Sequence, residues 1–445
     1  MALRTTTADG RANSTAPKVL RNRWLQLGAG ILGMIMIANL QYGWTLFVNP
    51  IDNVHHWGLT AIQVAFTIFV LCETWLVPVE GYLVDRFGPS VMVAIGGLFV
   101  AAAWAVNAAA DSLAMLYVGG ALGGLGAGIV YGTASGNALK WFPDRRGLAA
   151  GLTAAGFGAG AALTVLPIAN MIETSGYASA FMTFGVIQGV GVLVAAVILR
   201  APRSGEVSPV HARLAQVKRD YEPLEMVRQP VFWLLYLMMT MVAMGGLMAT
   251  AQLGPIATDF KVDESPVTLG WVSMAALPFA LSLDRVMNGL TRPFTGWVSD
   301  RVGRAPTMTV MFGLQAVVIA LLVLTASQPM LFVIFSGLAF FSWGEIFSLF
   351  PAISGDLFGR QYATTNYGVL YTAKGTAALL VPLGSALQAA TGSWLPIFLA
   401  AMVFNAAASV LAGFVLPAVT RTHIANSGRR DSARSVVVPA TGGAD

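Results

Sequence analysis

Long stretches of apolar residues, interrupted by short polar connections, follow one another along the whole chain. A helix needs about 20 consecutive apolar residues to cross the hydrocarbon core of a bilayer. Charge-free intervals, such as Arg23 to Asp52 and Arg86 to Asp111, are each long enough for one such helix. A helix on a soluble core would carry a polar face, and these stretches carry none. We therefore predict an all-α integral membrane protein with twelve transmembrane helices, at residues 25–48, 61–83, 91–110, 114–140, 147–171, 178–199, 231–257, 267–297, 305–326, 330–350, 362–389 and 394–417.

One long polar connection, rich in Arg, Lys, Glu and Pro, divides the twelve predicted spans into two sets of six. Its composition is that of a solvated linker. We expect an N-terminal tail at 1–23, a six-helix bundle at 24–199, a linker at 200–230, a second six-helix bundle at 231–417 and a C-terminal tail at 418–445.

The distribution of charge predicts how the chain is oriented. Only 11% of the residues are charged, against roughly a quarter in a soluble domain. Of the 26 lysines and arginines, 22 fall on the two tails and on alternate connections, and only Lys261 falls on the opposite set. This bias places both tails and the linker in the cytoplasm. The net charge of +5 therefore indicates membrane topology and not nucleic-acid binding.

The residues that most often serve enzymes are not gathered in the predicted spans. The four histidines, at 55, 56, 211 and 423, lie in connections or in the C-terminal tail, and the single Cys72 allows no intramolecular disulfide. We predict no enzyme activity, no metal and no cofactor. The apolar run after residue 23 is a full span and not a short signal core, so we expect no cleaved leader.

A motif occurs twice, after the second and after the eighth predicted span. Its shared pattern is Gly-x-x-x-Asp-Arg-x-Gly, formed by Gly81, Asp85, Arg86 and Gly88 and again by Gly296, Asp300, Arg301 and Gly303. With this repeat, the chain resembles the major facilitator superfamily over essentially its whole length. The resemblance implies two six-helix halves that rock about a central site. It further implies that the glycines allow close helix contact, while Asp and Arg pair across the cytoplasmic face and gate its opening.

Ionisable side chains inside the predicted spans are the candidates for chemistry, because each costs about 3 kcal/mol or more unless it is paired or hydrated. They are Glu73, Glu80, Asp284, Arg285, Arg292, Glu345 and Lys374. Glu80 adjoins the first motif, where we expect a structural role.

In the eighth span, a turn of 100° per residue puts Asp284, Arg285, Asn288 and Arg292 on one helix face. Arg292 and Lys374, from different helices of one half, could hold an anion between them. The arginine fork matches both oxygens of a carboxylate, and lysine adds a mobile point charge. In the alternative, the two cations only neutralise Asp284 and Glu345.

The chain also resembles the oxalate:formate antiporter family of bacterial anion exchangers. The matching segments are residues 22–24, 41–46, 128–132, 141–149, 291–294 and 356–368. The resemblance implies that Arg292 and Lys374 bind the carboxylates of the anion. It implies an aromatic wall that includes Tyr42, Tyr131 and Trp343, with Gln63 toward the outer side. Gln41, Phe347 and Tyr371 complete the predicted substrate-binding set.

The chain departs from the pattern of that family at several of these positions. Phe157 and Phe347 stand where the family pattern has aromatic residues with a hydroxyl, and Tyr371 stands where it has Trp. Glu73, Asp284, Arg285 and Glu345 stand where it has uncharged residues. With Asn288, these four are candidates for ion coupling, because carboxylates near the site would partly cancel the two cations.

Two transport mechanisms remain open at this point. The sequence favours an exchanger of small carboxylates in a bacterial inner membrane, with a small organic anion and the lipid bilayer as its partners, working as a monomer. The alternative is a proton-coupled monocarboxylate symporter, whose family also carries an Asp and an Arg in the eighth span. A further alternative is a sensor that binds a solute without transporting it, and such a protein would usually carry an extra signalling domain.

Overall fold

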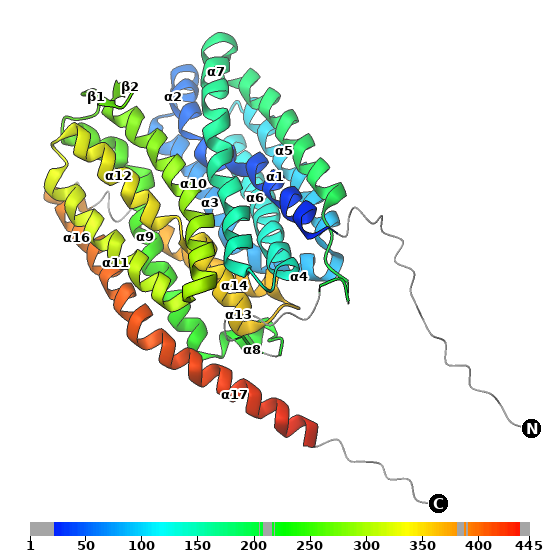
Figure 1. The fold of residues 1–445 in the computed structure, drawn as a ribbon. Coiled ribbons are helices and arrows are strands. Elements are labelled where there is room, and N and C mark those ends of the chain that lie inside the picture. Colours follow the sequence, from blue (N-terminus) through cyan, green and yellow to red (C-terminus); the bar gives the residue numbers. More distant parts are fainter. Residues whose placement is uncertain are drawn as a thin grey trace, which may run out of the picture.

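A computed structural model describes residues 22–203, 205–207, 216–217, 219–380, 387–388 and 390–436. The chain folds almost wholly into helices (Figure 1). In order they are α1 (Arg23–Tyr42), α2 (Thr45–His55), α3 (Leu59–Trp75), α4 (Val77–Phe87), α5 (Pro89–Ala108), α6 (Leu113–Trp141), α7 (Arg146–Ile198), α8 (Pro223–Val227), α9 (Pro230–Asp259), α10 (Ala276–Val302), α11 (Arg304–Thr325), α12 (Pro329–Trp343), α13 (Ile346–Phe358), α14 (Ala363–Ala378), α16 (Leu395–Val410) and α17 (Leu416–Val436).

The helices confirm the predicted class of membrane protein. Within the described residues, eight helices are long and apolar enough to cross a bilayer, or nine if the bent pair α3 and α4 counts as one span. The total of twelve stays a prediction, because several predicted spans are interrupted.

The interruptions lie where glycine or proline breaks the backbone hydrogen bonds. Gly43 ends α1 inside the first predicted span. The second span bends by 46° between α3 and α4, just before Pro78. The tenth breaks at Gly344 and Glu345, between α12 and α13. The bend between α3 and α4 gives the side chains on its two sides different directions.

The predicted start of the eighth span is wrong. Residues 267–275 were expected to be helical, but they belong to an antiparallel hairpin of β1 (Pro266–Leu269) and β2 (Val272–Ala275). Pro266 disfavours continuation of a helix, Gly270 turns the chain at φ 63°, and the hydroxyls of Thr268 and Ser273 bond across the strands. The span begins only at Ala276.

Two other segments are longer than expected. The last helix runs through a π-helical turn at Leu411–Val415 and continues as α17 into the predicted tail. Helix α7 contains both the fifth and the sixth predicted spans, joined at Gly176, whose φ of 81° and ψ of 160° reverse the chain. Figure 1 shows α7 rising to this turn and descending beside α5.

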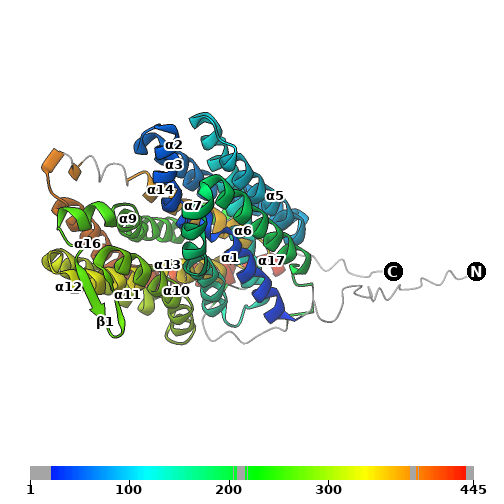
Figure 2. The ribbon, with the colours of Figure 1, turned by 90° about the horizontal axis from the view of Figure 1, so that it is seen from above.

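The two sets of helices meet along two lines. Helix α7 packs against α10, and α4 packs against α14. Seen from above, α9, α11, α12 and α16 gather on one side and α1, α5 and α6 on the other, with α7 and α10 between them (Figure 2). The hairpin lies at one end of the bundle and α8 at the other. We call these the hairpin end and the linker end.

Candidate functional site

Lys374 on α14 lies in an ion pair with Glu73 on α3. The Lys374 Nζ is 3.0 Å from Oε2 and 3.2 Å from Oε1 of Glu73. It also donates to the hydroxyl of Tyr371 at 3.0 Å and to Oε1 of Gln41 at 3.4 Å. Lys374 and Glu73 are 1% and 0% exposed. This buried cluster therefore connects the two halves of the chain, because α3 belongs to one and α14 to the other.

Arg292 on α10 is fully buried, and no ion pair to it occurs in the described part of the chain. Its guanidinium donates to the carbonyl oxygen of Ala154 on α7 at 2.7 Å and to Oδ1 of Asn288 at 2.5 Å. Its Nε has no hydrogen-bond partner among the described residues. The guanidinium carbon is 4.5 Å from the ring centroid of Phe347. Arg292 thus retains unused donors in a dry environment.

Phe347 connects the two cations. Its ring centroid is 4.5 Å from the Arg292 guanidinium and 5.8 Å from the Lys374 Nζ. The structure therefore brings together the two predicted anion-binding cations, around one aromatic side chain.

The predicted aromatic residues surround this pair as a connected cluster. Tyr131 and Tyr371 stack at 4.8 Å, and Trp343 meets Phe347 edge to face at 5.5 Å. Phe157 touches both Tyr42 and Tyr131. All six are at least nine-tenths buried. Such a wall excludes water and strengthens the electrostatic attraction within it.

Tyr367 belongs to the same cluster, although it was absent from the predicted site. It is fully buried, and its ring is 5.5 Å from that of Tyr371, one helical turn along α14. The hydroxyls of Tyr367 and Tyr131 are buried without a well-formed hydrogen bond to the described residues. The spacing of four residues from Tyr371 was the available signal, because it puts the two side chains on one helix face.

The four coupling candidates other than Glu73 lie near the site but in different surroundings. Asp284 and Glu345 are fully buried, and their carboxyl oxygens lack well-formed hydrogen bonds within the described structure. Arg285 is half-buried and stacks over Tyr42 of α1 at 4.5 Å. Asn288 bridges Arg292 and the carbonyl oxygen of Phe340. In the alternative, Arg292 and Lys374 only neutralise Asp284 and Glu345. This is wrong for Lys374, because its ammonium group is paired with Glu73.

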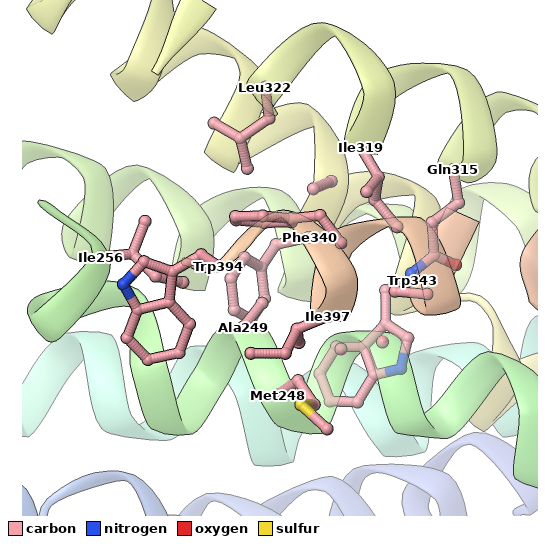
Figure 3. Close-up of a pocket in the computed structure, with 15 residues that line it drawn as sticks. Met248, Ala249, Ile256, Gln315, Ile319, Leu322, Phe340, Trp343, Trp394 and Ile397 are labelled. Carbon is pink, nitrogen blue, oxygen red and sulfur yellow. The ribbon is translucent and has the colours of Figure 1, made fainter. Parts of the chain in front are cut away.

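A narrow apolar cavity lies behind Trp343 (Figure 3). It has a volume of about 40 Å³, and Gln315, Ile319, Phe340 and Ile397 contribute to its lining. The Trp343 Nε1 and the Gln315 Oε1 lack hydrogen-bond partners in the part of the chain that the structure describes. The cavity is lined mainly by apolar side chains and shares Trp343 with the predicted site, but neither Arg292 nor Lys374 belongs to its lining.

The two motif aspartates take equivalent positions at the linker end. Asp300 accepts hydrogen bonds from the backbone N–H groups of Gly147 and Leu148, at the start of α7. Asp85 accepts from the backbone N–H and the hydroxyl of Thr365, near the start of α14. Each carboxylate thus lies at the positive N-terminus of a helix from the other half, where a negative charge is stabilised.

The predicted pairing of the motif arginines with these aspartates is not observed among the described residues. Arg86 lies over Phe87 and Arg301 over Trp297. The cations that reach the aspartates are Lys140 on Asp85, at 2.5 Å, and Arg304 on Asp300, at 2.6 Å. The motif arginines are exposed at the ends of their helices, whereas Lys140 and Arg304 lie closer to the interface.

A buried ion-pair network seals the same end. Asp356 on α13 accepts from Arg146 on α7 at 2.9 Å and from Arg304 at 2.8 Å. The linker residue Gln216 donates to Asp356 and to the carbonyl oxygen of Pro143, so it touches both halves.

The motif glycines allow the backbones to approach at this end. A Cβ added to Gly296 would lie 2.0 Å from the carbonyl oxygen of Gly147, and one added to Gly81 would lie 2.9 Å from Cα of Thr365. The linker end is closed in this structure.

The side chain of Gln63 lies outside the described residues. No cluster of His, Cys, Asp and Glu suited to a metal occurs within the described part of the chain.

Comparisons with known proteins agree with the helical membrane fold. The family model described as Major Facilitator Superfamily matches residues 29–286 and 253–442. The oxalate:formate antiporter of Oxalobacter formigenes is 37% identical, over 91% of this chain and 94% of its own. Human monocarboxylate transporter 11 is 33% identical over 25% of this chain and 24% of its own. A solved proton:xylose symporter superposes with a TM-score of 0.67 at 12% identity, covering 88% of this chain and 94% of the symporter.

Proposed function

Because the chain belongs to the major facilitator superfamily, and is therefore a multi-pass membrane transporter and not an enzyme, we propose that it carries small carboxylate anions across the bacterial inner membrane. The observation that carries the proposal is the convergence of two buried cations, Arg292 and Lys374, around Phe347. Buried cations inside a membrane are costly, so their retention in a dry aromatic site favours an anionic substrate. The similarity to an oxalate:formate antiporter supports the same class.

Alternating access accounts for the arrangement of the two halves. The linker end is closed by helix-capping carboxylates and by the network around Asp356. The charge bias predicts that the linker lies in the cytoplasm. Closure of the linker end then means that substrate reaches the site from the outer side of the membrane. Rocking of the two halves would break the contacts of Asp85, Asp300 and Asp356 and open the cytoplasmic side.

We expect the loss of Asp300 to loosen the linker end. Asp300→Ala removes the acceptor for Gly147, Leu148 and Arg304, each contact being worth about 1 kcal/mol or more. The population open at that end should rise at least tenfold, since a loss of about 1.4 kcal/mol already corresponds to a factor of ten. The measurement is the rate at which a linker-side maleimide labels Thr364→Cys in a Cys72→Ser background. Thr364 is buried against Gly136 between the halves.

The matched control for this experiment is Asp111→Ala, which removes an exposed aspartate on the connection between α5 and α6. It should leave the labelling rate unchanged. Equal labelling in Asp300→Ala and the wild type would show that the capping carboxylate does not hold this end closed.

Obligatory exchange is the mode of transport that this site supports best. An empty site that still holds an unpaired Arg292 must close dry around a charge, which is unfavourable, and a bound anion removes that cost. The carrier would then cross the membrane only when loaded. A second candidate is proton-linked symport, which is favoured by the buried carboxyls of Asp284 and Glu345 and by the Glu73–Lys374 ion pair, because they lower the charge of the empty site.

Uptake into liposomes separates these two mechanisms. Under exchange, labelled carboxylate uptake into preloaded vesicles should exceed uptake into empty vesicles by at least tenfold, with or without a proton gradient. Asp284→Asn and Glu345→Gln should keep that preference. Strong uptake into empty vesicles, driven by an inward proton gradient and lost in either variant, would establish symport.

A further inference from the structure

The two cations of the site differ in how many hydrogen-bond donors remain for a substrate. An ammonium group has three donors, and those of Lys374 face Glu73, Tyr371 and Gln41. A guanidinium has five donors, and Arg292 uses two of them, on Ala154 and Asn288. Lys374 is therefore saturated by the protein, whereas Arg292 has three donors left within the described structure.

The two cations also differ in whether a carboxylate neutralises them. Glu73 is a carboxylate at 3.0 Å from Lys374, so the pair carries no net charge. The hydroxyl of Tyr371 also donates to Glu73, at 3.3 Å, which holds the carboxylate in place. Among the described residues, Asp284 and Glu345 have neither an ion-pair partner nor a well-formed hydrogen bond. Of the two predicted anion-binding cations, Arg292 is therefore the one without a carboxylate partner within the described structure.

From this asymmetry we propose that Glu73 acts as a built-in carboxylate that restricts the substrate to monocarboxylates. This proposal rests on the proposed carboxylate transport and names the class within it. A monocarboxylate satisfies Arg292 and leaves the Glu73–Lys374 pair intact. The second carboxylate of a dianion would have to displace Glu73 from Lys374 and leave it buried without a partner, which is strongly unfavourable.

The surroundings suit the rest of such a substrate. Beside the Arg292 guanidinium lie the rings of Phe347 and, in contact with it, Trp343. An aromatic wall offers contact to a short hydrocarbon chain and has no charge for a second carboxylate. Of the two fully buried cations at Phe347, only Arg292 keeps donors for a carboxylate, and it lies next to an apolar surface.

The test uses the purified full-length chain in liposomes preloaded with unlabelled substrate. Uptake of labelled formate and lactate is compared with uptake of labelled oxalate and malonate. In the wild type, the monocarboxylates should be taken up at least tenfold faster than the dicarboxylates. Glu73→Gln keeps the shape and one hydrogen bond to Lys374 but removes the competing charge. It should raise dicarboxylate uptake at least tenfold relative to monocarboxylate uptake.

Glu80→Gln is the matched control, because Glu80 is a buried carboxyl in the adjoining α4 that has no hydrogen-bond partner among the described residues. Its ratio of the two uptakes should equal that of the wild type. Equal uptake of both classes by the wild type, or an unchanged ratio in a folded Glu73→Gln variant, would refute the role of Glu73 while leaving carboxylate transport intact. If Glu73→Gln does not fold, the wild-type ratio alone decides. Absence of uptake of all four anions would overturn the proposed function as well.

Discussion

Substitution of Arg292 by lysine should reduce carboxylate uptake by at least a hundredfold, although the charge at the position is kept. The guanidinium holds the Ala154 carbonyl and Asn288 with two of its donors and has the others available for substrate. A lysine ammonium has only three donors and lacks the planar fork that matches two carboxylate oxygens. Loss of one bidentate charge-assisted contact together with its positioning amounts to about 3 kcal/mol, or roughly a factor of a hundred.

The measurement is initial uptake of labelled formate into preloaded liposomes, at matched amounts of inserted protein. Arg421→Lys, an exposed arginine on α17, serves as the control and should retain full activity. Normal transport by Arg292→Lys, or by a folded Arg292→Ala variant, would remove Arg292 from the substrate site.

Substitution of Lys374 by methionine should destabilise the protein by about 3–5 kcal/mol, because it leaves Glu73 buried without a cation. Methionine retains much of the length of lysine, so the change is mainly one of charge. The double variant Glu73→Gln/Lys374→Met should recover most of the lost stability, since neither partner is then charged. Neither variant should exchange dicarboxylates.

Thermal unfolding in detergent, followed by loss of the folded monodisperse species, measures this effect. The single substitution should lower the unfolding midpoint well below that of the wild type, and the double substitution should return most of the way. A Lys374→Met protein as stable as the wild type would mean that the Glu73–Lys374 pair contributes nothing to the packing of α3 on α14.

Hydrophobicity alone was enough to predict the membrane class and the position of most helices, because the bilayer imposes one requirement of length and polarity on every span. It could not predict the hairpin at 266–275, because the apolar residues there continue the pattern of the eighth span although the helix begins only at Ala276. Nor could it predict the breaks near Leu76 and Gly344, because a proline or glycine in a membrane helix is tolerated when neighbouring groups satisfy the freed backbone.

The candidate site could be predicted in its members but not in its pairings. Arg292, Lys374 and Glu73 stood out because charges are rare within the spans. That Lys374 pairs with Glu73, 301 residues away, depends on how α3 and α14 face each other across the two halves. No pattern along one helix contains that information. Tyr367 is absent from the predicted set, although its spacing of four residues from Tyr371 puts both side chains on one helix face.

We expect the two spans of α7 to enter the bilayer together as a helical hairpin, because the turn at Gly176 leaves almost no chain between them. A side chain at position 176 would resist the φ of 81° that this turn requires. Substitution of Gly176 would therefore strain the connection that lets the two spans form a hairpin.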